Sequence, residues 1–139
     1  VFMASTSGLT PILCVGEKAR DTQGLFLKEV AEQITLGMSL LPQQYRSKII
    51  IAYEPVYAIG APKPPSEADI HHMILSILKS LTQTYGASVA RMIPVLYGGA
   101  VDATSAPHLL QAIPELRGFL VGRASVDAEK WRDLIHSLA

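Results

Sequence analysis

The chain of 139 residues has little of several features that mark particular classes of protein. It has a single cysteine, so no disulfide can form within it, and this is typical of a reducing, cytoplasmic location. Twelve basic and twelve acidic residues give a net charge of zero, which offers no attraction to nucleic acid or to an anionic membrane. No apolar run reaches the roughly 18 residues of a membrane span. The opening residues lack both the basic start of a signal peptide and an initiator methionine, from which we expect part of a longer protein.

Short apolar runs alternate with segments of helical periodicity along the whole chain. Each run is continuously apolar, as a strand covered on both faces requires, and the intervening segments carry apolar residues on one face. The clearest helix begins at Ser66, with Asp69 three residues later as its capping partner, and stops near Gly86. Its expected inner face is Ile70, Met73, Ile74, Ile77, Leu78 and Leu81. The expected strands are 12–15, 49–53, 93–97 and 118–121. The other expected helices are 25–41, a short one after 102, and one from 127. This last helix carries an apolar stripe of Trp131, Leu134, Ile135 and Leu138.

Four strand–helix repeats predict an α/β fold with right-handed parallel β–α–β connections. Such a sheet carries its chemistry at the carboxyl ends of the strands, and these ends read VGE, EPVYAIG, YGGA and VGRAS. Glycine-rich turns before helices expose backbone N–H groups that bind anions, most often phosphate. Several such turns at one edge of the sheet therefore predict a phosphate site.

The four strand ends also carry a family resemblance. The segments PILCVGE, AYEPVYAIG, VLYGGAV and GFLVGRAS resemble successive motifs of the triosephosphate isomerase family, and AYEPVYAIG is the most specific of them. The family fold is the eight-stranded (β/α)8 TIM barrel of about 250 residues. Residues 1–139 are similar to its C-terminal half, strands five to eight, so the resemblance implies a single half-barrel of four β/α units.

The resemblance implies an aldose–ketose isomerase that needs no cofactor or metal. Its substrate is a small phosphorylated sugar, with glyceraldehyde 3-phosphate and dihydroxyacetone phosphate interconverted through an enediolate. Glu54 matches the catalytic base, because a partly desolvated carboxylate held near a C–H group can remove its proton. The alternative is that Glu54 only braces the loop after it. Backbone N–H groups of Gly60, Ala100, Gly122 and Arg123 match the family's phosphate donors, while the Arg123 side chain either contacts the phosphate or points into solvent.

The loop after Glu54 departs from the family pattern. It reads AIGAPKPP over residues 58–65, where the family loop closes through two latch bonds. The residue after YGG, Ala100, has no hydroxyl, and Pro62 has no N–H, so the first bond loses both partners. Tyr97 is the latch tyrosine of the second bond, but Pro65 lacks the N–H that would donate to it. We therefore expect a different or less complete closure, and isomerases of four-carbon ketose phosphates, which this loop and the Gly-Arg turn resemble, provide an alternative substrate.

Other chemistry-bearing residues have structural interpretations. Cys14 is expected to be a buried, inert thiol, Glu17 a structural carboxylate and Lys63 a solvated loop residue. The histidines have no metal-ligand spacing and are expected on helix surfaces: His71, His72, His108 and His136.

The family's electrophilic histidine and its lysine have no counterpart in this chain. Without the electrophile a large electrostatic contribution is lost, so we expect the isolated chain to be inactive. Four strands cut from a barrel also leave two open edges, at the strands of Cys14 and Leu120. We expect a homo-oligomer, such as a homodimer, or association with a complementary N-terminal half. The alternative function is a non-catalytic half-barrel that self-assembles.

Overall fold

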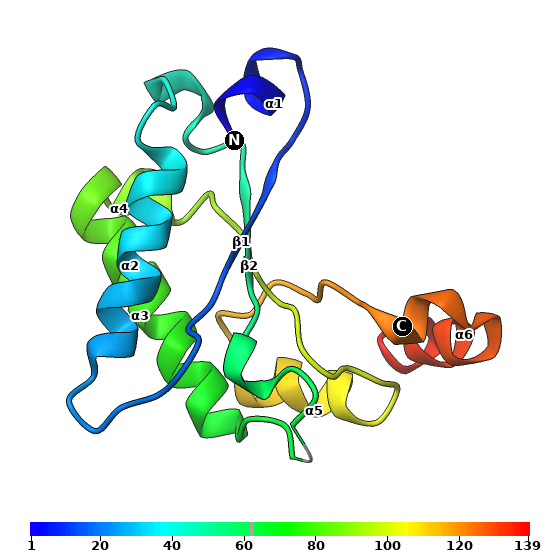
Figure 1. Ribbon diagram of the computed structural model, residues 1–139. Coiled ribbons are helices and arrows are strands. Elements are labelled where there is room, and N and C mark those ends of the chain that lie inside the picture. The colour runs from blue at the N-terminus through cyan, green and yellow to red at the C-terminus, as the bar shows by residue number, and fades with distance from the viewer. Residues whose placement is uncertain (62) are drawn as a thin grey trace.

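A parallel sheet lies at the centre of the computed structural model, which describes residues 1–61 and 63–139 (Figure 1). Its strands are β1 (Ile12–Val15), β2 (Ile50–Tyr53) and β3 (Val95–Tyr97), in the order β1-β2-β3. The α-helices are α1 (Phe2–Thr6), α2 (Leu25–Met38), α3 (Glu67–Tyr85), α4 (Ala87–Ala90), α5 (Ser105–Ala112) and α6 (Ala128–Ser137). The described residues also form the 3-10 turns η1 (Gln43–Tyr45), η2 (Val56–Ala58) and η3 (Arg123–Val126). In the described part of the chain, no helix has the length and apolar character needed to cross a membrane.

Helix α3 confirms the capping prediction. The Asp69 N–H donates to Ser66 Oγ at 3.1 Å, and the Ser66 hydroxyl donates to Asp69 Oδ2 at 2.6 Å. The first bond satisfies a backbone donor that the first helical turn leaves free, and the second holds the Asp69 carboxylate beside the Ser66 hydroxyl. The expected inner face is buried except for the half-buried Leu78, and it forms the core together with α2 and the sheet.

The expected fourth strand is reduced to one bridge, between Tyr97 of β3 and Phe119. The Tyr97 N–H donates to the Gly118 carbonyl at 3.1 Å, and the Leu120 N–H donates to the Tyr97 carbonyl at 3.0 Å. Gly118 has a φ of 138°, which regular strand geometry does not use. The segment therefore runs beside β3 but pairs with it only briefly.

The two faces of the sheet are covered unequally. Leu13 of β1 faces α2, because a Cβ added to Gly37 of that helix would lie 2.8 Å from Leu13 Cδ2. Its neighbours Ile12 and Cys14 point to the opposite face, where Ile12 is 45% exposed and Cys14 is exposed. The prediction of a buried Cys14 was therefore wrong, because the described elements cover only one face of β1.

Helix α6 lies apart from the α2–α3 pair (Figure 1). Of its expected apolar stripe only Leu134 is buried, while Trp131 is 39% exposed and Ile135 is 48% exposed. The helix packs on α5 and on the short segment around Phe119, with a small apolar groove between them. Because this segment pairs only briefly with β3, it offers α6 a narrow surface, and most of the stripe stays open.

Candidate active site

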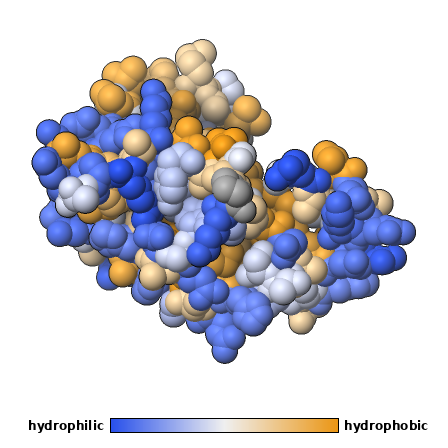
Figure 2. Space-filling view, turned by 60° about the horizontal axis from the view of Figure 1, so that its bottom comes forward, coloured by the Kyte–Doolittle hydropathy of each residue, from blue (hydrophilic) through white to orange (hydrophobic). Residues whose placement is uncertain are grey.

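A cleft of about 770 Å³ lies at the carboxyl ends of β2 and β3. Figure 2 views the molecule from this end and shows a hollow between the lobe that carries α6 and the rest of the molecule. The residues predicted for the phosphate site and the latch all line the cleft: Gly60, Tyr97, Ala100, Gly122 and Arg123. Three loops that are distant in the sequence, after β2, after β3 and after Phe119, therefore meet at one opening.

Glu54 lies directly after β2, beside this cleft. Its N–H donates to the Val15 carbonyl at 2.8 Å, which continues the pairing of β2 with β1. Its half-buried side chain lies over Gly98, where an added Cβ would be 2.7 Å from Glu54 Cγ and 3.1 Å from Oε1. Gly98 is one of the cleft residues, so its missing side chain leaves room for the carboxylate at the cleft wall.

The Cys14 thiol is a neighbour of this carboxylate on the open face of β1. Partial burial raises the pKa of the Cys14 thiol, and the charge and hydrogen bonding of Glu54 raise it further. A raised pKa keeps the thiol protonated near neutral pH, so Cys14 is a slow nucleophile despite its exposure.

The four predicted anion donors have free backbone N–H groups within the described residues. Gly60, Ala100, Gly122 and Arg123 are exposed, and none of their amides donates a hydrogen bond to a described partner. Amides that are already satisfied could not bind a ligand without breaking another bond, so these four are available.

The cleft is lined by two charged side chains, Arg123 and Asp102. The Asp102 carboxylate accepts hydrogen bonds from the Thr104 N–H at 3.0 Å and the Ser105 N–H at 2.8 Å, close to the start of α5. These backbone bonds, with the Ser105 hydroxyl, lower the pKa of Asp102. Arg123 is exposed and, among the described residues, forms no ion pair.

Tyr97 is 1% exposed, and its ring centroid lies 6.1 Å from that of Tyr53. Burial raises the pKa of the Tyr97 hydroxyl to about 12, so it stays protonated at neutral pH. Pro65 also lines the cleft and has no N–H to donate to it. The expectation for Pro62 lies outside the described residues.

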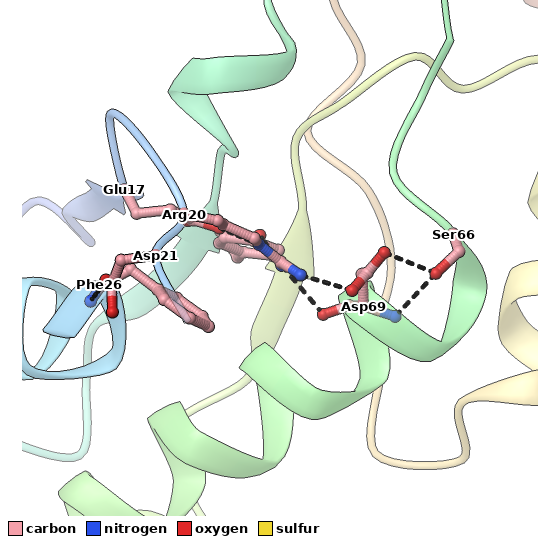
Figure 3. A network of polar contacts seen from close by, with 7 residues as sticks. Glu17, Arg20, Asp21, Phe26, Ser66 and Asp69 are labelled. Atoms are coloured by element: carbon pink, nitrogen blue, oxygen red, sulfur yellow. Dashed lines mark hydrogen bonds and ion pairs between the residues drawn. The ribbon is translucent and has the colours of Figure 1, made fainter. Parts of the chain in front are cut away.

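A cluster centred on Arg20 was not predicted from the sequence (Figure 3). The fully buried Glu17 accepts from Arg20 Nε at 3.0 Å and from the Tyr53 hydroxyl at 3.0 Å, both on Oε1. Arg20 also pairs with Asp69 at the start of α3. Burial and the Glu17 charge both raise the pKa of Tyr53. Arg20 and Asp69 are 49 positions apart, a separation for which no local sequence pattern gives a signal.

Among the described residues, none of the histidines lines this cleft. His72, His108 and His136 are exposed, and His71 pairs with Glu115 at 3.0 Å. Within residues 1–61 and 63–139, no group of three or more His, Cys, Asp or Glu side chains is arranged to hold a metal ion.

Comparison with known proteins gives a consistent result. The triosephosphate isomerase family matches residues 1–138. The chain belongs to the triosephosphate isomerase family. The triosephosphate isomerase of Porphyromonas gingivalis is 36% identical over 138 residues, covering 99% of this chain and 55% of the relative. The enzyme of Chlamydia caviae is 35% identical over 138 residues, with 99% and 53% covered, and that of Lawsonia intracellularis is 34% identical over 139 residues, with 97% and 53% covered.

The chain thus spans about half the length of the curated relatives it matches. The three-stranded parallel sheet with its helices is consistent with part of the family's barrel. Membership in the triosephosphate isomerase family therefore accounts for both the strand order and the motifs at the strand ends.

Proposed function

We propose that this chain supplies the C-terminal half of an aldose–ketose isomerase barrel that acts on glyceraldehyde 3-phosphate and dihydroxyacetone phosphate. The observation that carries the proposal is that Gly60, Ala100, Gly122 and Arg123 line the same cleft, with Glu54 lying over Gly98 at its wall. A phosphate held by backbone amides at one end of a small substrate places the carbon chain within a short distance of that wall.

Each group has a separate role in the proposed reaction. The four free amides bind the phosphate oxygens, and charge-assisted bonds of this kind are stronger than neutral ones. The Glu54 carboxylate removes a proton from one carbon and returns it to the next, through an enediolate. Half-burial of Glu54 removes part of its water, which favours proton abstraction from carbon.

We expect full activity only when catalytic residues from outside this chain complete the site. The family's electrophilic histidine and its lysine have no counterpart at the strand ends of this chain, and one missing oxyanion donor typically costs about two to three decades of rate. The open face of β1, with Ile12 45% exposed, requires a cover. We propose that the cover is a complementary half-barrel or a second copy of the chain.

A second candidate function is a non-catalytic half-barrel that self-assembles, which the exposed apolar side chains of β1 favour. A four-carbon ketose phosphate is the alternative substrate, because the alanine-proline loop and the Gly-Arg turn resemble isomerases that act on such sugars. A larger substrate leaves the proposed chemistry at Glu54 unchanged.

Binding and chemistry can be tested separately. Titration of the chain with inorganic phosphate, with chloride as the ionic-strength control, should shift the amide resonances of the four donor residues together. The chain alone and its mixture with the N-terminal half of a relative are then incubated in deuterated water with dihydroxyacetone phosphate or erythrulose 4-phosphate. Deuterium incorporation by the mixture, lost in Glu54→Gln, supports the isomerase. Phosphate that shifts none of the four amides contradicts the site, and a discrete dimer without incorporation favours the non-catalytic half-barrel.

A further inference from the structure

The loop after β1 is held in place by hydrogen bonds to α2, including the first turn of that helix. The Gln33 side chain of α2 bonds both backbone groups of Gly16, with distances of 2.8 Å to the N–H and 3.0 Å to the carbonyl. Further along the loop, Asp21 accepts from the N–H groups of Leu25 and Phe26, each at 3.0 Å, and so binds the loop to the start of α2. Arg20 projects from a segment that is held at both ends.

The Arg20 side chain extends from the β1 loop and contacts residues on both sides of the loop that follows Glu54. Its Nη2 lies 3.3 Å from the hydroxyl of Tyr53, the last residue of β2, and 3.2 Å from the Asp69 carbonyl in α3. Its Nη1 donates to the Asp69 carboxylate. The guanidinium also lies over the ring of Tyr57 in η2, at 5.2 Å from the centroid. Figure 3 shows how the side chain extends from the β1 loop to the start of α3.

The loop between these ends has few other attachments. Its described backbone bonds are mostly local, from Ala58, Ile59 and Ala61 to carbonyls three residues earlier. The Tyr57 N–H does reach outside the loop, to the Glu17 carbonyl at 3.3 Å, and Glu17 itself binds Arg20. Ile59 is 75% exposed, so packing contributes little to its position. Apart from the buried Pro55 directly after Glu54, the Arg20 cluster is thus the main attachment of the described part of the loop.

We propose that Arg20 is a positioning residue that joins the two flanks of the loop after Glu54, at Tyr53 and Asp69, and thereby places Gly60 at the cleft. Its planar fork reaches Tyr53, Glu17 and Asp69 from one centre, which a lysine ammonium cannot reproduce. The effect on anion binding rests on the proposed function, whereas the effect on loop order does not.

The test compares Arg20→Lys with Arg46→Lys in the 139-residue chain. Arg46 is a matched control, because it also donates to a carbonyl, that of Leu41 at 3.1 Å, and lies over a tyrosine ring, that of Tyr85 at 5.4 Å. Hydrogen exchange is measured at the loop amides of Tyr57, Ala58, Ile59 and Ala61 and at the amides of β2. We expect loop exchange to be about ten- to hundredfold faster in Arg20→Lys, with β2 changed much less. Arg46→Lys should leave the loop as in the wild type.

Equal acceleration of loop and β2 amides would mean that Arg20 supports only global stability and would overturn the proposal. If Arg20→Lys does not fold, Tyr57→Leu replaces it, because this variant keeps every ion pair and removes only the ring. Loop exchange about three- to tenfold faster is then expected, and no change overturns the proposal.

Inorganic phosphate provides a second measurement on the folded variants. Its dissociation constant should rise about tenfold in Arg20→Lys and stay constant in Arg46→Lys. A wild-type chain that binds no phosphate contradicts the proposed function, and the exchange result then decides the role of Arg20 alone. Unchanged affinity in Arg20→Lys, with a binding wild type, contradicts the placement of the cleft groups by Arg20.

Discussion

Replacement of Gly16 by alanine should force the ends of β1 and β2 apart. A Cβ at this position would lie 1.7 Å from the Glu54 carbonyl oxygen and 2.6 Å from its carbon. Both are backbone atoms and cannot rotate away, so the chains must separate until the contact reaches an ordinary distance. The adjacent bond from the Glu54 N–H to the Val15 carbonyl, 2.8 Å, lies directly in the affected region.

The magnitude follows from the hydrogen bonds at risk. These are the bond between the Glu54 N–H and the Val15 carbonyl and the two bonds between the Gln33 side chain and the Gly16 backbone. At about 1 kcal/mol net for each bond, Gly16→Ala should lower the free energy of unfolding by roughly 3 kcal/mol. That is a large part of the 5–15 kcal/mol typical of a domain. For an m-value of about 2 kcal/mol/M, the urea midpoint followed by circular dichroism should fall by roughly 1.5 M.

Gly37→Ala is the control for this prediction. The new Cβ would also be close to a neighbour, 2.8 Å from Leu13 Cδ2, but that atom ends a flexible side chain. Relief of the contact costs little, and alanine gains roughly 0.5–1 kcal/mol over glycine inside a helix. A Gly16→Ala variant as stable as Gly37→Ala would refute the close approach of the two strand ends.

Two further predictions concern pH. The backbone N–H of Lys130, followed by the charge of Lys130, lowers the pKa of Asp127 below its ordinary value of 3.8, so the α6 cap is complete above pH 4 and is lost as pH falls through the lowered value. In Asp127→Asn the Lys130 amide resonance should stop titrating in this range, and a persistent titration would assign it to another group. The pH dependence that Tyr97 adds runs in the opposite direction. Its pKa is raised from 10.0 to about 12, so its contribution to stability is complete below pH 10 and is lost as pH rises toward 12. The fall in urea midpoint between pH 9 and 12 should be smaller in Tyr97→Phe, and an equal fall would exclude Tyr97 as a source.

The regular elements were largely predictable from local patterns. The capping pair Ser66 and Asp69 and the apolar period of α3 act over a few residues, so the sequence shows them directly. The expected strand at 118–121 was longer than its one observed bridge, because pairing depends on a neighbour and not on the apolar run alone. Cys14 was misjudged for a similar reason: a continuous apolar run predicts cover on both faces, and here helices cover one.

The candidate site was likewise predictable only where local motifs mark its residues. Motif positions predicted five of the residues that line the cleft, although their role in phosphate binding stays a prediction. The Arg20 contacts to Tyr53 and Asp69 join residues 33 and 49 positions apart, and Gln33 bonds Gly16 across 17 positions. Such contacts depend on how the chain folds back on itself, and a single sequence carries no signal for them.

The exposed position of Cys14 also gives the chain an intrinsic reporter. It is the single cysteine of the sequence, and it lies on the face of β1 that the described helices leave open. A thiol reagent therefore modifies one defined atom, at a rate set by what covers that face and slowed at neutral pH by the raised pKa of the thiol. A fluorophore or spin label attached there would test whether the proposed cover, a complementary half-barrel or a second copy, binds to this face, without any engineered substitution.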